Sequence, residues 1–326
     1  MPELRRHYFL DEYCIIAAER KKRPSDFKRE RSDAADEKRC PFCPGNEEIT
    51  PPGVAVYTEQ GVLADGPERI RNWKMRVFPN LFATVVPSPV PPTAEWIALS
   101  GRGYHEVIVD SPQHDENPAD FSQDHMERLC QVYQDRYANY RSLGQYISIF
   151  KNWGNEAGAS LSHSHSQVIV IPVIPPLIVR EVEAISKASF CLFCNVIDRE
   201  RASSRLIAEN DNWILISPFY SIAPYETWIL PKRHFSNLAE MEDEELKSLA
   251  SMLKRALGSI NLLLNNPPYN CMIYQLSSGY HLSIRIQPAI SKIAGFERTT
   301  GIYINSIPPE KAARQSFPKS ATGLER

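Results

Sequence analysis

The chain has 326 residues, of which 43% are hydrophobic and 23% charged, values typical of a soluble globular protein with one large or two ordinary domains. Its net charge of −2 provides no bulk attraction to nucleic acid or to an anionic membrane surface, so neither is expected as a partner. No apolar run approaches the ~20 residues that cross a bilayer, and the N-terminus lacks the apolar core of a signal peptide. The expected location is the cytoplasm.

Four of the seven cysteines form two C-x2-C pairs, Cys40–Cys43 and Cys191–Cys194. A disulfide framework suits small secreted domains, so metal binding or redox chemistry is the better interpretation of these pairs. The single cysteines are predicted to be small buried hydrophobes; they are Cys14, Cys130 and Cys271.

The first predicted strand covers residues 13–18 and is followed by a basic turn, Arg20 to Pro24, and a charged stretch, residues 25–39, expected to be an exposed loop. Taken alone, the basic turn is more typical of a solvated surface than of an anion contact. Beyond the first cysteine pair, the pattern predicts an interrupted strand over residues 76–86, a strand over 103–110, a helix over 121–142 capped by Asp120 or Ser122, and a strand over 146–150.

The stretch from Phe150 to Pro172 holds the strongest signal for a site. A loop with two glycines leads into His163-Ser-His165-Ser-Gln167, which continues directly into the apolar run 168–171. Because strand side chains alternate between faces, His163, His165 and Gln167 are predicted to share one face. Three polar side chains on one face of an apolar strand are a poor way to fill a core.

The second half repeats the order of the first: a C-x2-C pair, strands over 213–216 and 226–234, a helix over 243–264, and strands over 269–275 and 281–288. The sequence therefore predicts an α+β fold made of a duplicated unit, with a mostly antiparallel sheet and flanking helices. The predicted domains are residues 1–176, which carry the site, and residues 177–326.

Each half also offers four metal ligands in the same order, a pattern that favours two closed structural zinc sites. The first set is Cys40, Cys43, His114 and one of His163 or His165; the second is Cys191, Cys194, His234 and His281.

One histidine of the central pair remains free in this scheme, and a neutral imidazole can attack phosphorus to form a phosphoramidate. Backbone N–H groups of residues 154–162, the Gln167 amide and the Ser160 hydroxyl could hold the phosphate. No P-loop or Rossmann pattern competes with this interpretation. In the second half Ser283 replaces the second histidine, so one copy is expected to be catalytic and the other structural.

Two alternatives from other classes stay open on the residues alone. In the first, His163 and His165 bind one metal ion together, which gives an open-site metallohydrolase. In the second, the protein is a zinc-stapled binding or structural module without enzymatic activity.

Several motifs together resemble the galactose-1-phosphate uridylyltransferase branch of the histidine-triad superfamily, over nearly the whole chain. They are His163-x-His165-x-Gln167, Phe150-x-Asn152-x-Gly154, Gly158-x-Ser160, Arg20-x-x-Arg23-Pro24, Cys40-x-x-Cys43-Pro-Gly, Val77-Phe78-x-Asn80, Ser111-Pro112-x-His114 and Gly295-Phe296-Glu297. The second metal set, with Cys191 and Cys194, is similar to that of the plant ADP-glucose phosphorylase of this branch.

The resemblance implies a ping-pong nucleotidyl transfer in which His165 is the nucleophile and His163 completes the zinc site. It implies that Gln167, Ser160 and Asn152 hold the α-phosphate, with Gly158 letting the backbone approach it. Asn80 would lie by the nucleoside, Glu297 would bind sugar hydroxyls, and Arg20 and Arg23 would meet phosphate charge, in place of the solvated surface favoured above.

The expected reaction moves UMP from UDP-glucose to a hexose 1-phosphate, galactose 1-phosphate, with a homodimer as the assembly. The alternative is an ADP-glucose phosphorylase or a dinucleoside polyphosphate adenylyltransferase that uses the same histidine. Leu81, which follows Asn80 where the bacterial uridylyltransferases have aspartate, leaves the choice of base open.

Overall fold

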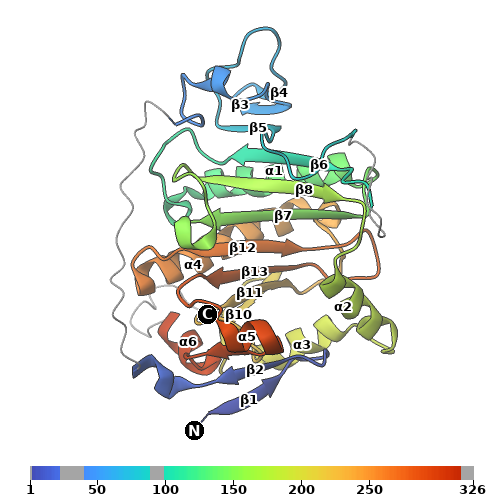
Figure 1. Ribbon diagram of the computed structural model, residues 1–326, viewed down its shortest axis with the longest axis vertical. Helices are drawn as coiled ribbons and strands as arrows, with labels where there is room; N and C mark the ends of the chain where they lie inside the picture. The colour runs from blue at the N-terminus through green and yellow to red at the C-terminus, as the bar shows by residue number, and fades with distance from the viewer. Residues whose placement is uncertain (1, 23–39, 89–98, 317–326) are drawn as a thin grey trace.

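The computed structural model describes residues 2–22, 40–88 and 99–316. An eleven-stranded sheet runs through the molecule in the order β4-β3-β5-β6-β8-β7-β12-β13-β11-β10-β9, as Figure 1 shows. A separate three-stranded sheet, in the order β1-β2-β14, lies at the bottom of that view and brings the two ends of the described chain together.

The strands are β1 (Glu3–Arg6), β2 (Tyr13–Ile16), β3 (Ala55–Thr58), β4 (Gly61–Leu63), β5 (Met75–Pro79), β6 (Tyr104–Val109), β7 (Tyr146–Trp153), β8 (His165–Ile171), β9 (Leu206–Glu209), β10 (Trp213–Ile216), β11 (Thr227–Pro231), β12 (Tyr269–Tyr274), β13 (Ser283–Pro288) and β14 (Tyr303–Asn305). The α-helices are α1 (Gln123–Tyr140), α2 (Pro176–Ser186), α3 (Leu192–Arg201), α4 (Asp243–Leu264), α5 (Gly295–Thr300) and α6 (Pro309–Ser316). Short 3-10 helices cover Ala18–Lys22 (η1), Glu47–Ile49 (η3), Pro118–Asp120 (η4), Asn155–Ala157 (η5) and Leu238–Glu240 (η6).

Every pairing in the large sheet is antiparallel, and β7 pairs with β12 at its middle. On either side of that pair the strands follow in mirrored order, so that β8, β6 and β5 correspond to β13, β11 and β10. The predicted α+β class, the duplicated unit and the mostly antiparallel sheet are confirmed. The division into domains 1–176 and 177–326 stays a prediction.

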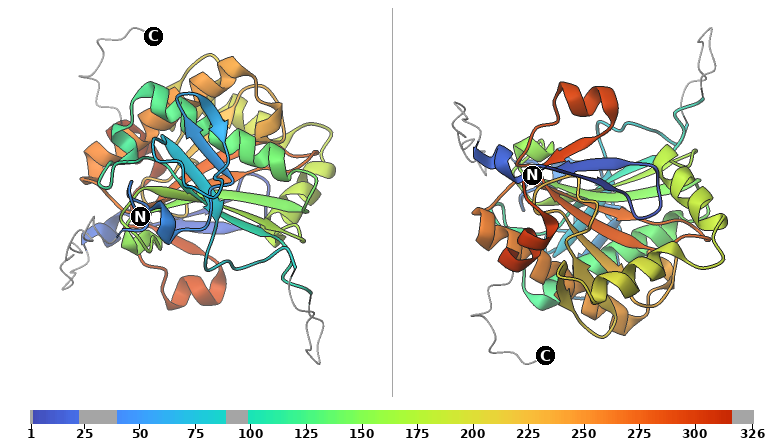
Figure 2. Two further views of the ribbon diagram at one scale, coloured as in Figure 1. Left: turned by 90° about the horizontal axis from the view of Figure 1, so that it is seen from above. Right: turned by 90° about the horizontal axis from the view of Figure 1, so that it is seen from below.

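The long helices α1 and α4 lie side by side on one face of the sheet, as the end-on views of Figure 2 show. The α1 helix begins after Ser122, whose hydroxyl accepts a hydrogen bond from the His125 N–H at 3.1 Å, and α4 begins with a capping box between Glu242 and Glu245. Their apolar stripes and the strand residues beneath them form the largest core cluster. No helix in the described ranges is long and apolar enough to cross a membrane.

Several predicted elements are shorter in the structure. The strand expected over residues 76–86 ends at Pro79, which has no N–H to donate, and a turn follows in which the Asn80 side chain accepts the Phe82 N–H at 2.8 Å. β8 and β13 begin two residues after the predicted strands, at His165 and Ser283, because His163 and His281 belong to Cys/His clusters beyond the strand ends. The expected loop over residues 25–39 lies outside the described residues.

Candidate active site and two candidate metal centres

His165 is the first residue of β8, and it is buried with 6% of its surface exposed. Its Nδ1 donates a hydrogen bond to the backbone carbonyl of His163 at 2.9 Å. A neutral imidazole carries one ring proton, so this bond leaves the Nε2 lone pair available. Burial lowers the pKa of His165, the carbonyl bond raises it in part, and nearby Lys151 lowers it further. The neutral, nucleophilic form is therefore favoured.

Gln167 follows on the same face of β8, as the strand alternation predicts, and is half-buried. Its Oε1 lies 2.8 Å from Nε2 of His105 on β6, and the same nitrogen lies 3.1 Å from Nδ2 of Asn80, just after β5. Three adjacent strands thus bring Asn80 and Gln167 to the same nitrogen of one imidazole.

The loop between β7 and β8 is shaped by Gly154 and Gly158, whose φ angles of +83° and +90° lie where other residues are strained. The N–H groups of Ala157, Gly158 and Ala159 all bond to carbonyls within this loop. The amides expected to contact a phosphate must therefore come from other loop residues, and the exposed Ser160 lies next to this bonded segment.

Asn152, near the end of β7, is held from the neighbouring strand. Its Oδ1 accepts a hydrogen bond from Nδ2 of Asn270 on β12 at 2.8 Å, and Asn270 also donates to the Ala157 carbonyl at 2.8 Å. With its oxygen engaged, Asn152 has its amino group free to donate. The pairing register places Asn152 directly opposite Asn270, across the contact between the two halves.

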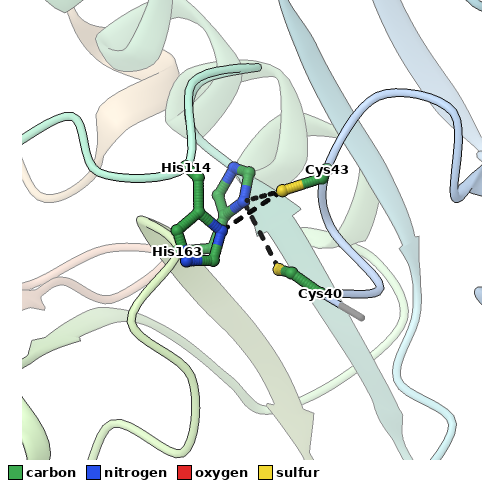
Figure 3. A group of neighbouring side chains, drawn as sticks. All are labelled: Cys40, Cys43, His114 and His163. Carbon is green, nitrogen blue, oxygen red and sulfur yellow. Dashed lines mark hydrogen bonds between the residues drawn. The ribbon is translucent and has the colours of Figure 1, made fainter. Parts of the chain in front are cut away.

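The first Cys/His cluster lies beside His165 and contains Cys40, Cys43, His114 and His163, all buried (Figure 3). Cys43 Sγ lies 3.2 Å from His114 Nδ1 and 3.5 Å from His163 Nδ1, and Cys40 Sγ lies 3.6 Å from His163 Nδ1. Zinc–sulfur bonds of about 2.3 Å and zinc–nitrogen bonds of about 2.0–2.1 Å place neighbouring tetrahedral ligands roughly 3.3–3.8 Å apart. The four ligand atoms therefore fit one zinc ion.

The second cluster contains Cys191, Cys194, His234 and His281. Its Sγ–Nδ1 distances are 3.6 Å from Cys191 to His281 and 3.7 Å from Cys194 to either histidine, while the two histidine Nδ1 atoms lie 3.2 Å apart. The donor set fits zinc equally well. It differs in exposure, because both cysteines are half-buried and His234 is exposed.

In each cluster one histidine makes an equivalent hydrogen bond to a backbone carbonyl outside the ligand set. His163 Nε2 lies 2.8 Å from the Ser111 carbonyl, and His281 Nε2 lies 3.1 Å from the Pro231 carbonyl, residues that correspond in the two halves. A carbonyl that accepts from Nε2 leaves the Nδ1 lone pair for a metal. His163 thus belongs to the first cluster and His165 to neither, which opposes the alternative in which both bind one ion.

The second half has no histidine in the position that corresponds to His165. Ser283 takes the place of His165 and is fully buried, while Arg285, in the place of Gln167, is paired with Glu181 at 2.8 Å. The two copies therefore differ: each has a Cys/His cluster, and among the described residues a second histidine two positions after the last cluster histidine occurs in the first half and not in the second.

Two predicted binding residues, Arg20 and Glu297, are not assembled with His165 in the described chain. Arg20 is exposed on η1, and Glu297 lies on α5, which Figure 1 places with α6 over the second half, where its carboxylate accepts the Ala294 N–H at 3.1 Å. Arg23 lies outside the described residues. Within one chain, the structure therefore does not bring Arg20 or Glu297 to His165.

Sequence reasoning missed several residues of the site. Phe42 lies between the first two cysteines, and the centre of its ring is 5.2 Å from that of His165. The other missed residues lie on or next to the strands of the site: His105 on β6, Asp110 directly after β6, Lys151 on β7 and Asn270 on β12. A usable signal existed for His105, because it alternates with Val107 and Val109 and so faces the same side of the sheet as Gln167.

Two family models match the chain: galactose-1-phosphate uridyl transferase, N-terminal domain, over residues 1–175, and a domain of unknown function (DUF4921) over residues 111–319. An ADP-glucose phosphorylase of Arabidopsis thaliana is 32% identical, covering 96% of this chain and 92% of the relative. A galactose-1-phosphate uridylyltransferase of Thermotoga maritima is 29% identical, covering 97% of this chain and 98% of the relative.

A crystal structure of an Arabidopsis thaliana ADP-glucose phosphorylase with bound ADP-glucose superposes with a TM-score of 0.81 at 30% identity, covering 97% of this chain and 98% of that one. A structure described as a uridylyltransferase superposes with a TM-score of 0.74 at 29% identity, covering 97% of each chain. The chain belongs to the galactose-1-phosphate uridylyltransferase family of nucleotidyltransferases.

Proposed function

We propose that the protein transfers a nucleoside monophosphate from a nucleotide sugar to a phosphate acceptor through a covalent intermediate on His165. The observation that carries this proposal is the hydrogen bond from His165 Nδ1 to the His163 carbonyl, 2.9 Å long. This bond fixes the proton of the neutral ring on Nδ1, so Nε2 carries the free lone pair. No described side chain of the protein binds Nε2.

In the first step, Nε2 attacks the α-phosphorus and forms an N–P bond while the bond to the bridging oxygen breaks. The sugar 1-phosphate leaves with that electron pair, and the carbonyl of His163 stabilises the positive charge that develops on the ring. In the second step, a phosphate oxygen of the acceptor attacks the same phosphorus, and the electron pair returns to Nε2. Gln167, Asn152 and Ser160 are the proposed donors to the phosphoryl oxygens.

The proposed donor is UDP-glucose and the proposed acceptor a hexose 1-phosphate, galactose 1-phosphate. The second candidate is an ADP-glucose phosphorylase, in which inorganic phosphate takes AMP from His165. It is supported by the Arabidopsis relative, with 32% identity and a TM-score of 0.81 for its ADP-glucose complex, and by Leu81 after Asn80.

Mass spectrometry of the intact protein after incubation with UDP-glucose or ADP-glucose, without acceptor, tests the function and the base together. We expect the mass of one uridylyl or adenylyl group to appear in the wild type. It should be absent from His165→Gly with its metal content and far-ultraviolet circular dichroism spectrum intact. A label retained in His165→Gly would rule out this nucleophile, and a wild type unlabelled by both nucleotide sugars would rule out the covalent route.

The clusters Cys40–Cys43–His114–His163 and Cys191–Cys194–His234–His281 are proposed as structural zinc sites. Zinc bound there would cross-link three segments of each half: the C-x2-C pair, the histidine that follows β6 or β11, and the histidine that precedes β8 or β13. In the first cluster, holding His163 also fixes the carbonyl that accepts from His165.

We also propose that the working assembly is a homodimer in which Arg20, Arg23 and Glu297 of one copy complete the site of the other. The support is that Arg20 and Glu297 lie apart from His165 in the single chain. Mixed dimers of His165→Gly and Glu297→Ala chains should regain activity that neither variant has alone. Mixtures as inactive as the separate variants would contradict the shared site.

A further inference from the structure

His105 has no part in the nucleophile or in either metal cluster, yet it lies at the centre of the polar face of the first half. It is on β6, beside β8, and is 7% exposed. The pairing register places it opposite Ile169, so Gln167 is its diagonal neighbour on the same face. A buried imidazole in such a position must find partners for both ring nitrogens.

The proton of this imidazole can be located from its neighbours. The backbone N–H of Thr84 donates to His105 Nδ1 at 3.2 Å, and the Thr84 hydroxyl lies 3.4 Å from the same atom. A nitrogen that accepts an N–H carries no proton of its own, so the neutral ring has its proton on Nε2. Burial lowers the pKa of His105, in agreement with a ring that stays neutral.

The Nε2 proton has one acceptor nearby. Gln167 Oε1 lies 2.8 Å away, whereas Asn80 presents its Nδ2 amino group at 3.1 Å because its own oxygen accepts the Phe82 N–H at 2.8 Å. His105 therefore donates to the oxygen of the Gln167 amide. An amide whose oxygen is held in this way must direct its amino group elsewhere.

We propose that His105 is a positioning residue that fixes the orientation of the Gln167 amide, so that its N–H donors, and not its oxygen, face the phosphoryl group transferred to His165. This inference rests on the proposed function. The two orientations of a free glutamine amide have nearly the same shape, but the wrong one would present a carbonyl oxygen to an anion. Catalysis by a fixed dipole requires that its orientation be set before the reaction.

The expected effect is on the chemical step more than on binding. His105→Leu removes the donor and leaves the Gln167 amide free to rotate, so the single-turnover rate of nucleotidyl transfer to His165 should fall about 10- to 100-fold, the usual effect of losing such a supporting contact. The dissociation constant of the nucleotide sugar should change less than the rate. His105→Gln, whose amide can both accept from Thr84 and donate to Gln167, should restore much of the rate.

A double-mutant comparison separates positioning from a general structural role. If His105 acts through Gln167, the variant His105→Leu/Gln167→Ala should be no slower than Gln167→Ala alone, because there is no amide left to orient. If the two losses multiply, His105 has another role and the inference is wrong. Metal content and circular dichroism of each variant show whether it is folded.

A measurement on the wild type does not depend on the variants folding. Histidine ring ¹⁵N chemical shifts should show His105 as the Nε2–H tautomer, and the Nδ1–H tautomer would overturn the inference. Failure of the proposed function gives a different result: the wild type then takes no label on His165. Rapid labelling of the wild type with an equally rapid His105→Leu variant would overturn the positioning role alone.

Discussion

Lys151 and Asp110 form a buried ion pair on the helix-covered side of the sheet, directly behind the strand that carries His165. Lys151 Nζ also donates to the Ser164 hydroxyl at 2.7 Å and to the His165 backbone carbonyl at 3.2 Å, and Asp110 Oδ1 accepts from the Ser166 hydroxyl at 2.9 Å. One cation and one carboxylate thus tie β6, β7 and β8 together behind His165.

Removing one partner of this pair should lower the free energy of unfolding strongly, because the other charge is left unpaired in the core. Lys151→Met should lower the free energy of unfolding by about 3–5 kcal/mol in urea titrations, and the double variant Lys151→Met/Asp110→Leu should recover part of that loss. The exposed pair Lys247–Glu244 is a matched control, and Lys247→Met should change stability by less than about 1 kcal/mol. Equal small effects at both sites would contradict the role of the buried pair.

The two Cys/His clusters, once loaded with zinc, are predicted to lose the ion at different rates. All four ligands of the first are buried, whereas the second has an exposed histidine and two half-buried cysteines, so a chelator reaches it more readily. With a chromophoric chelator we expect one fast and one slow phase of zinc release. The fast phase should be missing in Cys191→Ser and retained in Cys40→Ser, and the reverse assignment would refute the prediction.

The elements best predicted from sequence have local signals. The helix expected over residues 243–264 coincides with α4 (Asp243–Leu264), because its apolar periodicity, its acidic first turn and the left-handed Asn265 at its end all lie close in sequence. The three-stranded sheet was not foreseen: β2 pairs with β14 nearly 290 residues later, and three- or four-residue strands carry little alternation.

In the candidate site too, features with a local sequence signal could be predicted and features that depend on distant pairing could not. The ligand sets and the shared face of His165 and Gln167 could be predicted because duplication repeats the order and strand alternation sets the face. The sequence alone left open which histidine joins the cysteines; in the structure His163 lies in their cluster, while His165 Nδ1 bonds to a carbonyl at 2.9 Å. Alternation gives the face of His105, but its contact with Gln167 and the contacts of Lys151 depend on pairing between strands, which no local pattern encodes.

Gly154 is predicted to be the less replaceable of the two glycines in the β7–β8 loop. Its φ of +83° and ψ of 153° fall in a region that is essentially restricted to glycine, and an added Cβ would lie 2.8 Å from Pro268 Cβ. At Gly158, with φ of +90° and ψ of 15°, the nearest atom would be Asn152 Nδ2 at an ordinary 3.6 Å.

Gly154→Ala should therefore lower the free energy of unfolding by about 2–3 kcal/mol and Gly158→Ala by about 1 kcal/mol. Both variants should also raise the KM for the nucleotide sugar, since the loop precedes the nucleophile. Thermal and urea unfolding of the two variants provide the comparison. A Gly158→Ala variant that is the less stable of the two would show that contact with Pro268 does not matter.

The last prediction concerns the pH dependence of stability and rests on His7, an N-terminal residue that packs against Tyr220 and Trp228 of the second half. Its Nδ1 accepts the N–H groups of Phe9 and Leu10 at 3.3 and 3.1 Å, and the side chain is 5% exposed. Burial, with a further contribution from the positive charge of Arg285, lowers the pKa of His7 to about 3. In the unfolded chain the pKa returns to about 6.5.

Below pH 6.5, His7 is therefore protonated in the unfolded chain but stays neutral in the folded chain. The contribution of His7 to stability is complete above pH 6.5 and is lost as the pH falls toward 3, at up to about 1.4 kcal/mol per pH unit. His7→Asn keeps an oxygen that can accept the two N–H groups but does not titrate. Urea unfolding at pH 7 and pH 5 should show a smaller loss of stability for His7→Asn than for the wild type, because only the wild type has this proton to exclude. Equal losses would mean that His7 is protonated in the fold without penalty.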